Sequence, residues 1–287
     1  MDSIAAGKDV YLEKPMTRTL EEGQNIVKVV EKSDRIVQVG NQRRSGKHWE
    51  KARDMVTAGK IGDLRFIRTW DTRYRPNCPY VSRASRYKES LIDWKRFLGK
   101  APDRPYDPVR VSAWRWFWDY AGGLMTDIGP HRLDIAHWIS DTIGPKSVVC
   151  NGGNYHSPKW ETPDNVHAIL DCGTFCINFN VHFMNGYDSG GAGYYGTGGT
   201  IVQGHGKMRY VDTKGNVKTY NTRDVKIHSG VFPWRDLDKI YPNHSAWSFT
   251  MRAMGRSDLD WRVDSRGRIT CARCCKIVAP DPIACKL

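Results

Sequence analysis

The chain has 287 residues, of which 40% are hydrophobic and 11 are tryptophan. This content excludes an intrinsically disordered chain and leaves room for two domains with a sizeable core. No apolar run approaches the ~18 residues that a membrane-spanning helix needs. The formal net charge of +13 makes nucleic acid a candidate partner, but the basic residues are spread along the chain, and we expect neither nucleic-acid nor membrane binding.

The first elements form a strand, a helix and a second strand. Val10–Leu12 is a short apolar run, Thr19 begins a capping box at the start of a helical pattern, and residues 36–39 form the next strand. Such an order within about thirty residues predicts a right-handed βαβ unit with parallel strands. Because two parallel strands cannot bury both faces of a sheet, we expect a remnant of a larger doubly wound sheet, whose other half would precede this chain.

A second domain is predicted to follow this unit. Ser45 can cap a helix that ends at Gly59, and residues 64–70 then read as the first strand of a new sheet. We therefore expect one domain over residues 1–46, the C-terminal half of a Rossmann domain, and a second over residues 47–287.

The second domain is expected to contain a long connection and a large sheet. Five prolines between residues 74 and 113 predict a connection around one short helix near residues 91–98. Strand patterns between residues 147 and 220 predict an open, mostly antiparallel sheet. We expect the helix near Asp127 to cover one face, with the other free for a partner subunit. The fold class is thus α/β followed by α+β.

GAGYYG, residues 191–196, spells G-x-G-x-x-G, the pattern that places backbone against a pyrophosphate. The pattern has that function only when it follows a strand and opens a helix. Here both flanks, 176–183 and 200–202, read as strands. We predict a turn between strands that touches no phosphate.

The aromatic stretch WRWFWDY covers residues 114–120. If it is extended, Trp114, Trp116 and Trp118 share one face with Tyr120. Such a face can stack on a sugar ring or pack against other apolar groups, and both interpretations remain open. Its place just before Asp127 makes Asp119 and Tyr120 candidates for the rim of a site.

The eight cysteines predict neither a disulfide scaffold nor a metal site. CARCC, residues 271–275, lacks a second pair of ligands at the spacing of a structural zinc site.

Two short motifs could carry chemistry. Lys14 directly follows a predicted parallel strand, where open α/β sheets bind ligands, and an ammonium there can stabilise a developing alkoxide. Asp127 and His131 are four residues apart, so in one helix they share a face, and a carboxylate beside an imidazole suits a general base. The alternatives are a surface lysine, a helix-capping aspartate and a core histidine.

The segments EKPMTRTLEEGQNIVKVVEKSDRIVQVGNQRRS and GGLMTDIGPHRLDIAHWI resemble the glucose-fructose oxidoreductase, inositol dehydrogenase and rhizopine-catabolism family, written Gfo/Idh/MocA. The resemblance runs from about Gly7 to Thr200. It implies an N-terminal Rossmann domain for NAD or NADP and a C-terminal domain with a large open sheet. This sequence shows neither the glycine turn nor the ribose-binding acid of that Rossmann domain. We therefore expect residues 1–287 alone to bind NAD(P) weakly or not at all.

The resemblance also implies roles for individual residues. His131 would take the proton from a substrate hydroxyl, Asp127 would orient or bind beside it, and Lys14 would hold the oxygen. We expect these three to converge on one cleft between the two domains. The assigned sets are catalytic Lys14, Asp127 and His131; cofactor-binding Glu13, Lys14, Pro15, Asn41 and Gln42; and substrate-binding Arg43, Asp119, Tyr120, Asp127 and His131.

The function predicted from the sequence is an NAD(P)-dependent oxidoreductase acting on a sugar, a polyol or a derivative. Two alternatives remain open: an NAD-dependent glycosidase of the same fold, and a non-catalytic sugar-binding or dimerising module. We expect a cytoplasmic homo-oligomer that associates through the open sheet face.

Overall fold

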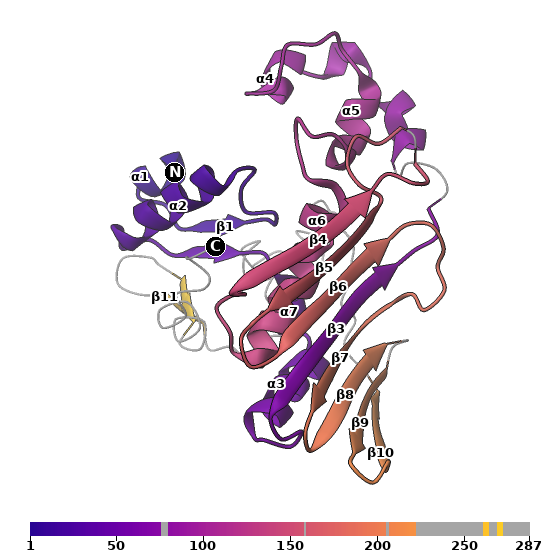
Figure 1. Cartoon of the computed structure of the whole chain (residues 1–287). Coiled ribbons are helices and arrows are strands. Elements are labelled where there is room, and N and C mark those ends of the chain that lie inside the picture. The colour runs from indigo at the N-terminus through magenta and orange to yellow at the C-terminus, as the bar shows by residue number, and fades with distance from the viewer. Residues whose placement is uncertain (76–79, 158, 205–206, 222–260, 264–268, 272–287) are drawn as a thin grey trace. The chain divides into compact units, whose positions relative to one another are not determined.

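The structure is a computed structural model that describes residues 1–75, 80–157, 159–204, 207–221, 261–263 and 269–271 (Figure 1). It divides into two compact units. The first unit comprises residues 1–58 and 220–287, and the second comprises residues 59–219. The domain boundary expected near residue 46 remains a prediction. Among the helices in the described ranges, none combines the length and apolarity needed to cross a bilayer.

The first unit contains the predicted βαβ arrangement. Strands β1 (Val10–Leu12) and β2 (Val37–Val39) pair in parallel, and α2 (Leu20–Glu31) connects them. The Thr19 hydroxyl accepts a hydrogen bond from the Glu22 amide at 3.2 Å, and the Glu22 carboxylate accepts one from the Thr19 amide at 3.4 Å. This capping box confirms the predicted start of α2.

The remaining elements of the first unit are short. They are α1 (Asp2–Ala5), η1 (Gln42–Ser45), α3 (Lys47–Thr57), and the antiparallel strands β11 (Trp261–Val263) and β12 (Ile269–Cys271). The N-cap of α3 is Gly46, so the prediction of Ser45 as its cap is wrong, because Ser45 ends the preceding 3-10 turn. Residues 272–275 of the CARCC segment lie outside the described residues.

The second unit is built on one eight-stranded sheet with the order β10-β9-β8-β7-β3-β6-β5-β4. β3 pairs with β6 in parallel and with β7 antiparallel, and the pairs β4–β5, β5–β6, β7–β8 and β8–β9 are antiparallel. The predicted mostly antiparallel sheet is confirmed. The strands are β3 (Leu64–Thr72), β4 (Ser147–Gly153), β5 (Asn165–Asp171), β6 (Cys176–His182), β7 (Gly190–Gly196), β8 (Gly199–Gly204), β9 (Lys207–Asp212) and β10 (Val217–Asn221).

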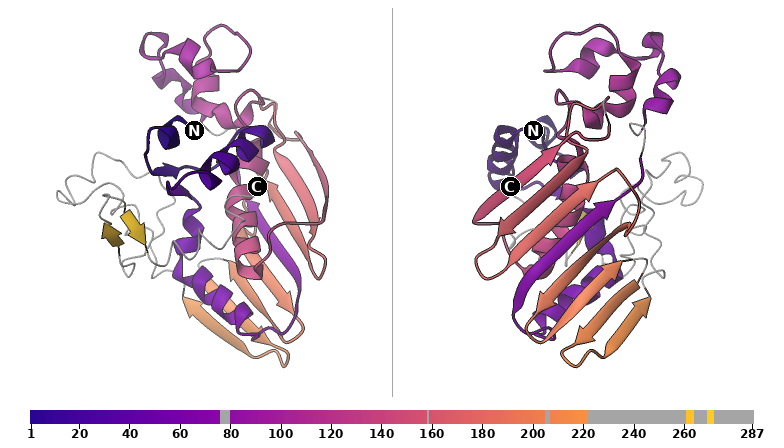
Figure 2. Two further views of the ribbon diagram at one scale, coloured as in Figure 1. Left: turned by 90° about the vertical axis from the view of Figure 1, so that its left-hand side faces the viewer. Right: turned by 45° about the vertical axis from the view of Figure 1, so that its right-hand side comes forward.

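Helices α6 (Gly123–Asp127) and α7 (Gly129–Ser140) cover one face of this sheet (Figure 2). The period-two pattern of the strands turns their apolar residues toward these helices, so Ile177 and Phe179 on β6 and Ile135 on α7 are buried. Burial of each such side chain contributes roughly 1.5–3 kcal/mol. The core therefore fixes α7 on the sheet.

The GAGYYG segment is strand β7, so its prediction as a turn is wrong, whereas the prediction that it opens no helix is confirmed. Its glycines make room for aromatic rings. A β-carbon at position 191 would lie 2.6 Å from Cζ2 of Trp70, and one at position 193 would lie 2.7 Å from the Tyr195 ring. The glycines therefore leave room for these two rings beside the strand.

The connection between β3 and α6 carries more short helices than the one predicted. They are η2 (Val81–Arg86), η3 (Glu89–Leu91), α4 (Trp94–Leu98), α5 (Pro108–Ala113) and η4 (Trp114–Trp116). The extended interpretation of WRWFWDY is wrong, because the segment begins as a 3-10 turn. Tertiary packing overrides its strand propensity: Trp116 is buried and stacks on Trp160 at 4.0 Å between ring centroids.

Candidate active site

In the first unit, six of the predicted site residues lie at the carboxyl edge of the parallel strand pair. Leu12 is aligned with Val39, and the Gly40 amide donates to the Leu12 carbonyl at 2.7 Å. The two loops that follow the strands therefore start side by side. They contain Glu13, Lys14 and Pro15 after β1, and Asn41, Gln42 and Arg43 after β2.

Gly40 permits close packing at this edge. A β-carbon at position 40 would lie 3.0 Å from the Tyr11 hydroxyl and 3.1 Å from the Glu13 carboxylate. Burial, and secondarily the charge of Glu13, raises the pKa of Tyr11 to about 12. The phenol therefore stays protonated at neutral pH and can donate a hydrogen bond.

Arg43 has an electrostatic neighbour in α3. The pKa of His48 is lowered from 6.5 to about 4, first by burial and then by the positive charge of Arg43. His48 is therefore neutral at physiological pH.

In the second unit, Asp127 and His131 lie on consecutive helices instead of one. Asp127 is the last residue of α6, and His131 lies in the first turn of α7. Ile128 between them keeps a right-handed helical conformation, and its carbonyl accepts from the His131 amide at 3.1 Å. The condition of one helix is not met, because the chain starts a new helix at Gly129 and Pro130, where proline is tolerated in the first turn.

Asp127 forms an ion pair that the sequence analysis did not predict. Arg115 Nε lies 3.2 Å from Asp127 Oδ1, and the two side chains are 28% and 19% exposed. The Arg115 guanidinium also lies over the rings of Trp114, at 4.4 Å, and Tyr80, at 5.3 Å. The carboxylate of Asp127 thus faces a cation that two aromatic rings hold in place.

A buried cluster connects the sheet with the start of α7. Asp71, near the end of β3, accepts from Arg132 Nη2 at 2.8 Å and from Arg73 Nε at 2.6 Å. Burial alone would raise the pKa of Asp71, but the charges of Arg132 and Arg73 and their hydrogen bonds lower it below its usual value. Arg132 is the neighbour of His131, so this cluster anchors the turn that carries the imidazole.

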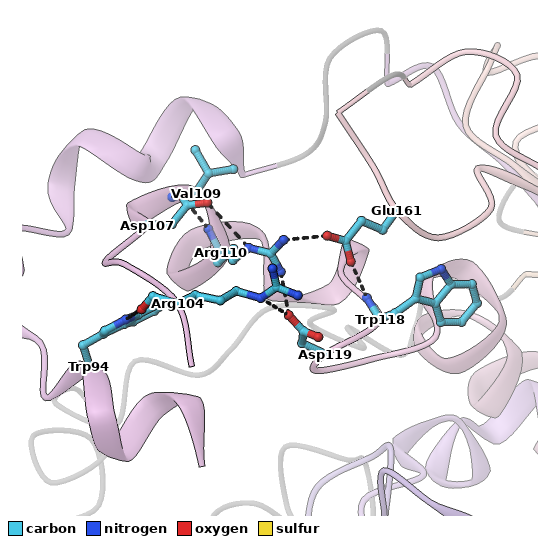
Figure 3. A network of polar contacts seen from close by, with 8 residues as sticks. All are labelled: Trp94, Arg104, Asp107, Val109, Arg110, Trp118, Asp119 and Glu161. Carbon is cyan, nitrogen blue, oxygen red and sulfur yellow. Dashed lines mark hydrogen bonds and ion pairs between the residues drawn. The ribbon is translucent and has the colours of Figure 1, made fainter. Parts of the chain in front are cut away.

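Asp119 lies in a separate network (Figure 3). Its Oδ2 atom accepts from Arg104 Nε and from Arg110 Nη1, both at 2.9 Å. Arg110 also binds Glu161 at 2.6 Å, and the other oxygen of Glu161 accepts from the Trp118 amide at 3.0 Å. These contacts hold the loop before α6. The prediction that Asp119 contacts substrate remains a prediction.

Tyr120 and Trp118 flank Asp119. Burial and the charge of Asp119 raise the pKa of Tyr120 despite an opposing effect of Arg110, and its ring lies 5.2 Å from that of Phe97. Trp118 is 51% exposed. The assignment of Tyr120 to substrate contact remains a prediction.

No pattern in the sequence predicted the polar partners that organise the second unit, namely Asp71, Arg73, Arg104, Arg110, Arg115, Arg132 and Glu161. The one available signal was the placement of Arg115 between two tryptophans, which is unusual for a solvated arginine. In the described part of the chain, no group of three or more His, Cys, Asp or Glu side chains could hold a metal ion.

Comparisons with known protein families match one segment of the first unit and one segment of the second unit. The profile described as "Oxidoreductase family, NAD-binding Rossmann fold" matches residues 1–41, and the profile described as "GFO/IDH/MocA C-terminal domain" matches residues 96–202. The chain is 32% identical over 173 residues to scyllo-inositol 2-dehydrogenase (NADP(+)) IolW of Bacillus subtilis (strain 168), covering 60% of this chain and 38% of that protein.

Solved structures share the fold. Levoglucosan dehydrogenase in complex with NADH and levoglucosan has a TM-score of 0.59 at 17% identity, covering 76% of this chain and 56% of that one. An NAD binding oxidoreductase from Klebsiella pneumoniae has a TM-score of 0.57 at 17% identity, covering 76% and 55%. The chain thus spans well under two thirds of the length of each of these proteins.

Proposed function

The chain belongs to the GFO/IDH/MocA oxidoreductase family, and from that premise we propose that it acts in an NAD(P)-dependent dehydrogenase that oxidises a sugar, a polyol or a derivative. The observation that carries the proposal is the Arg115–Asp127 pair beside the turn that holds His131. The proposal takes its substrate class from the names of the two dehydrogenases above.

The residues at the strand edge of the first unit fit part of such a cofactor. Gln42 Oε1 is buried and, within the described residues, has no hydrogen-bond partner, so it could accept a bond from a ligand amide. We assign cofactor contact to Glu13, Lys14, Pro15, Asn41 and Gln42. The chemistry that NAD(P) supplies when bound is acceptance of a hydride. The described residues show no glycine turn for its pyrophosphate.

The proposed steps on the protein's own residues are proton transfer and charge stabilisation. Neutral His131 Nε2 or Nδ1 accepts the proton of a substrate hydroxyl as that oxygen becomes a carbonyl. Asp127 stabilises the imidazolium that forms, and the Lys14 ammonium stabilises negative charge on the oxygen. We assign Arg43, Asp119 and Tyr120 to substrate contact. Convergence of Lys14 and His131 on one cleft remains a prediction.

A steady-state assay tests this proposal. The full chain is incubated with NAD⁺ or NADP⁺ and a panel of inositols and pyranoses, and formation of reduced nicotinamide is measured. We expect His131→Ala to lower kcat by roughly 10²–10⁴-fold, the usual contribution of a positioned general base. His156→Ala, at an exposed histidine of the same unit, is the matched control and should retain the parent kcat.

Product analysis separates the dehydrogenase from a glycosidase of the same fold. A dehydrogenase accumulates an oxidised product and reduced cofactor in equal amounts, whereas a transiently oxidising glycosidase releases a hydrolysed sugar with no net change in the cofactor. Sugar binding without either product would favour a binding module.

We also propose self-association through the face of the large sheet opposite α6 and α7. Val149 and Ile169 are paired across β4 and β5 on that face and are 74% and 52% exposed. Sedimentation velocity tests this, and the double variant Val149→Lys, Ile169→Lys should shift the chain toward the monomer.

For location we propose the cytoplasm, since Cys150, Cys172 and Cys176 are free thiols.

A further inference from the structure

The contacts of Arg115 assign it a function of its own. We propose that Arg115 is a positioning residue, which holds the Asp127 carboxylate ionised and in one orientation beside the turn that carries His131. The inference rests on the proposed function, because that proposal makes Asp127 and His131 the proton-handling pair. Neither the family comparison nor the sequence pattern assigns a role to this arginine.

The geometry of the pair is that of a partly desolvated ion pair. Arg115 Nε lies 3.2 Å from Asp127 Oδ1, and both side chains are less than one third exposed. A cation at this distance favours the charged form of a carboxyl group, and partial burial reduces screening by solvent. By comparison, the ion pair between Arg65 of β3 and Asp63, just before that strand, has side chains that are 54% and 72% exposed, so it should contribute little.

The aromatic contacts explain why an arginine is needed. The guanidinium carbon lies 4.4 Å from the Trp114 ring centroid and 5.3 Å from the Tyr80 centroid. The backbone of Tyr80 is itself held by Ser112, whose hydroxyl donates to the Tyr80 carbonyl. A planar cation stacks on rings in this way and a lysine ammonium does not, so lysine would keep the charge and lose the orientation.

A second set of charged contacts links Asp127 to Arg132, the neighbour of His131. The Arg73 guanidinium, bound to Asp71, also interacts electrostatically with Asp127. Asp71 in turn binds Arg132 on α7. Two aspartates and three arginines therefore alternate from η4 to the first turn of α7, and Arg115 is the outermost member. Its removal should leave the buried Asp71 cluster intact and change Asp127 alone.

The first test measures the ionisation of Asp127 directly. The Asp127 carboxyl carbon is followed by NMR during acid titration of the full chain, without cofactor or substrate. In Arg115→Met and Arg115→Gln the resonance should titrate at higher pH than in the parent, and in Arg115→Lys the shift should be smaller. Arg65→Met, which removes an exposed arginine of the same unit, should titrate like the parent.

The second test measures turnover in a preparation that shows activity. Arg115→Met should lower kcat by roughly 10- to 100-fold with little change in KM, because a misplaced proton-handling pair affects the transition state most. Arg115→Lys should recover part of the loss.

The outcomes separate the two proposals. An Asp127 titration that is the same in both uncharged Arg115 variants and in the parent overturns the inference, as does an unchanged kcat in an active preparation. If Arg115→Met does not fold, Arg115→Gln and Arg115→Lys give the same comparison. A parent that shows no turnover with any cofactor and polyol, while Asp127 still shifts in the variants, overturns the proposed function instead.

Discussion

The two units place their candidate residues by different means. In the first unit, the candidates follow from the backbone: two parallel strands end side by side, and the polar residues of both loops start at that edge. In the second unit, Arg115 holds Asp127, and Asp71 holds Arg132, the neighbour of His131. A backbone-defined site tolerates surface substitutions, whereas a site defined by buried ion pairs depends on every partner.

Within the second unit, two aspartates that bind arginines, Asp119 and Asp127, can be compared in the same way. Asp119 is bound by two arginines, and its side chain and that of Arg110 are each 12% exposed. Asp127 is more exposed and borders the start of α7. Asp119 is therefore held by two ion pairs and is less exposed than Asp127.

The largest expected effect comes from Asp71→Asn, which removes the carboxylate shared by Arg73 and Arg132. Two guanidinium groups would lose their counter-ion, one of them on a side chain that is 8% exposed. Loss of one member of a buried pair costs about 3–5 kcal/mol in the free energy of unfolding. Urea denaturation measures it, with Arg65→Met as the control. A change equal to that of the control would show that this cluster is not what anchors α7.

The same carboxylate predicts acid sensitivity. Because the folded-state pKa of Asp71 is lowered from its usual 3.8, its stabilisation is present above that pH and is lost as the pH falls through the lower, folded-state value. The parent should therefore lose stability below about pH 4 more steeply than Asp71→Asn, as measured by urea midpoints at several pH values.

A moderate effect is expected from Asp119→Asn. The substitution keeps the shape of the side chain but leaves Arg104 and Arg110 with a neutral acceptor, at a cost of roughly 1–3 kcal/mol. Thermal unfolding measures the change. If the network is mainly structural, substrate KM should change little; a large rise in KM with unchanged stability would instead support the prediction of substrate contact.

A smaller effect is expected in the first unit from Thr19→Ala. The change removes the hydroxyl that accepts from the Glu22 amide, and loss of an N-cap costs about 1 kcal/mol. Chemical denaturation measures it, and Thr19→Ser should behave like the parent. No loss in the alanine variant would mean that the rest of the unit holds α2 without its cap.

The last test is a titration. His48 should show a pKa of about 4 by NMR, against 6.5 for an unperturbed histidine. Because the unfolded chain binds this proton more readily, stability should fall as the pH drops from 6.5 to about 4 and then level off. Arg43→Gln should raise the pKa of His48 only in part, since burial is the larger cause. A pKa near 6.5 would show that His48 is solvated.

The sequence was sufficient to predict those features whose physical cause lies in residues close together in the chain. The capping box at Thr19 depends on residues three apart, and the parallel strands with their polar loops follow from one apolar run, one helix and another run. The alternation on β6 likewise predicted which face is buried. Asp127 and His131 stood out by their spacing of four residues, which within one helix would place both side chains on the same face.

What only the tertiary structure decided are the contacts between segments far apart in the chain. Arg115 and Asp127 are 12 residues apart and Arg132 and Asp71 are 61 apart, and no periodicity encodes such pairs. GAGYYG is a strand that pairs with β3 and β8 and packs Gly191 against the Trp70 ring, and the 3-10 turn at Trp116 stacks on Trp160. Sequence thus determined the elements and the residue types available for chemistry, whereas long-range packing determined which charges face one another, since ion pairing and ring stacking depend on distance in space.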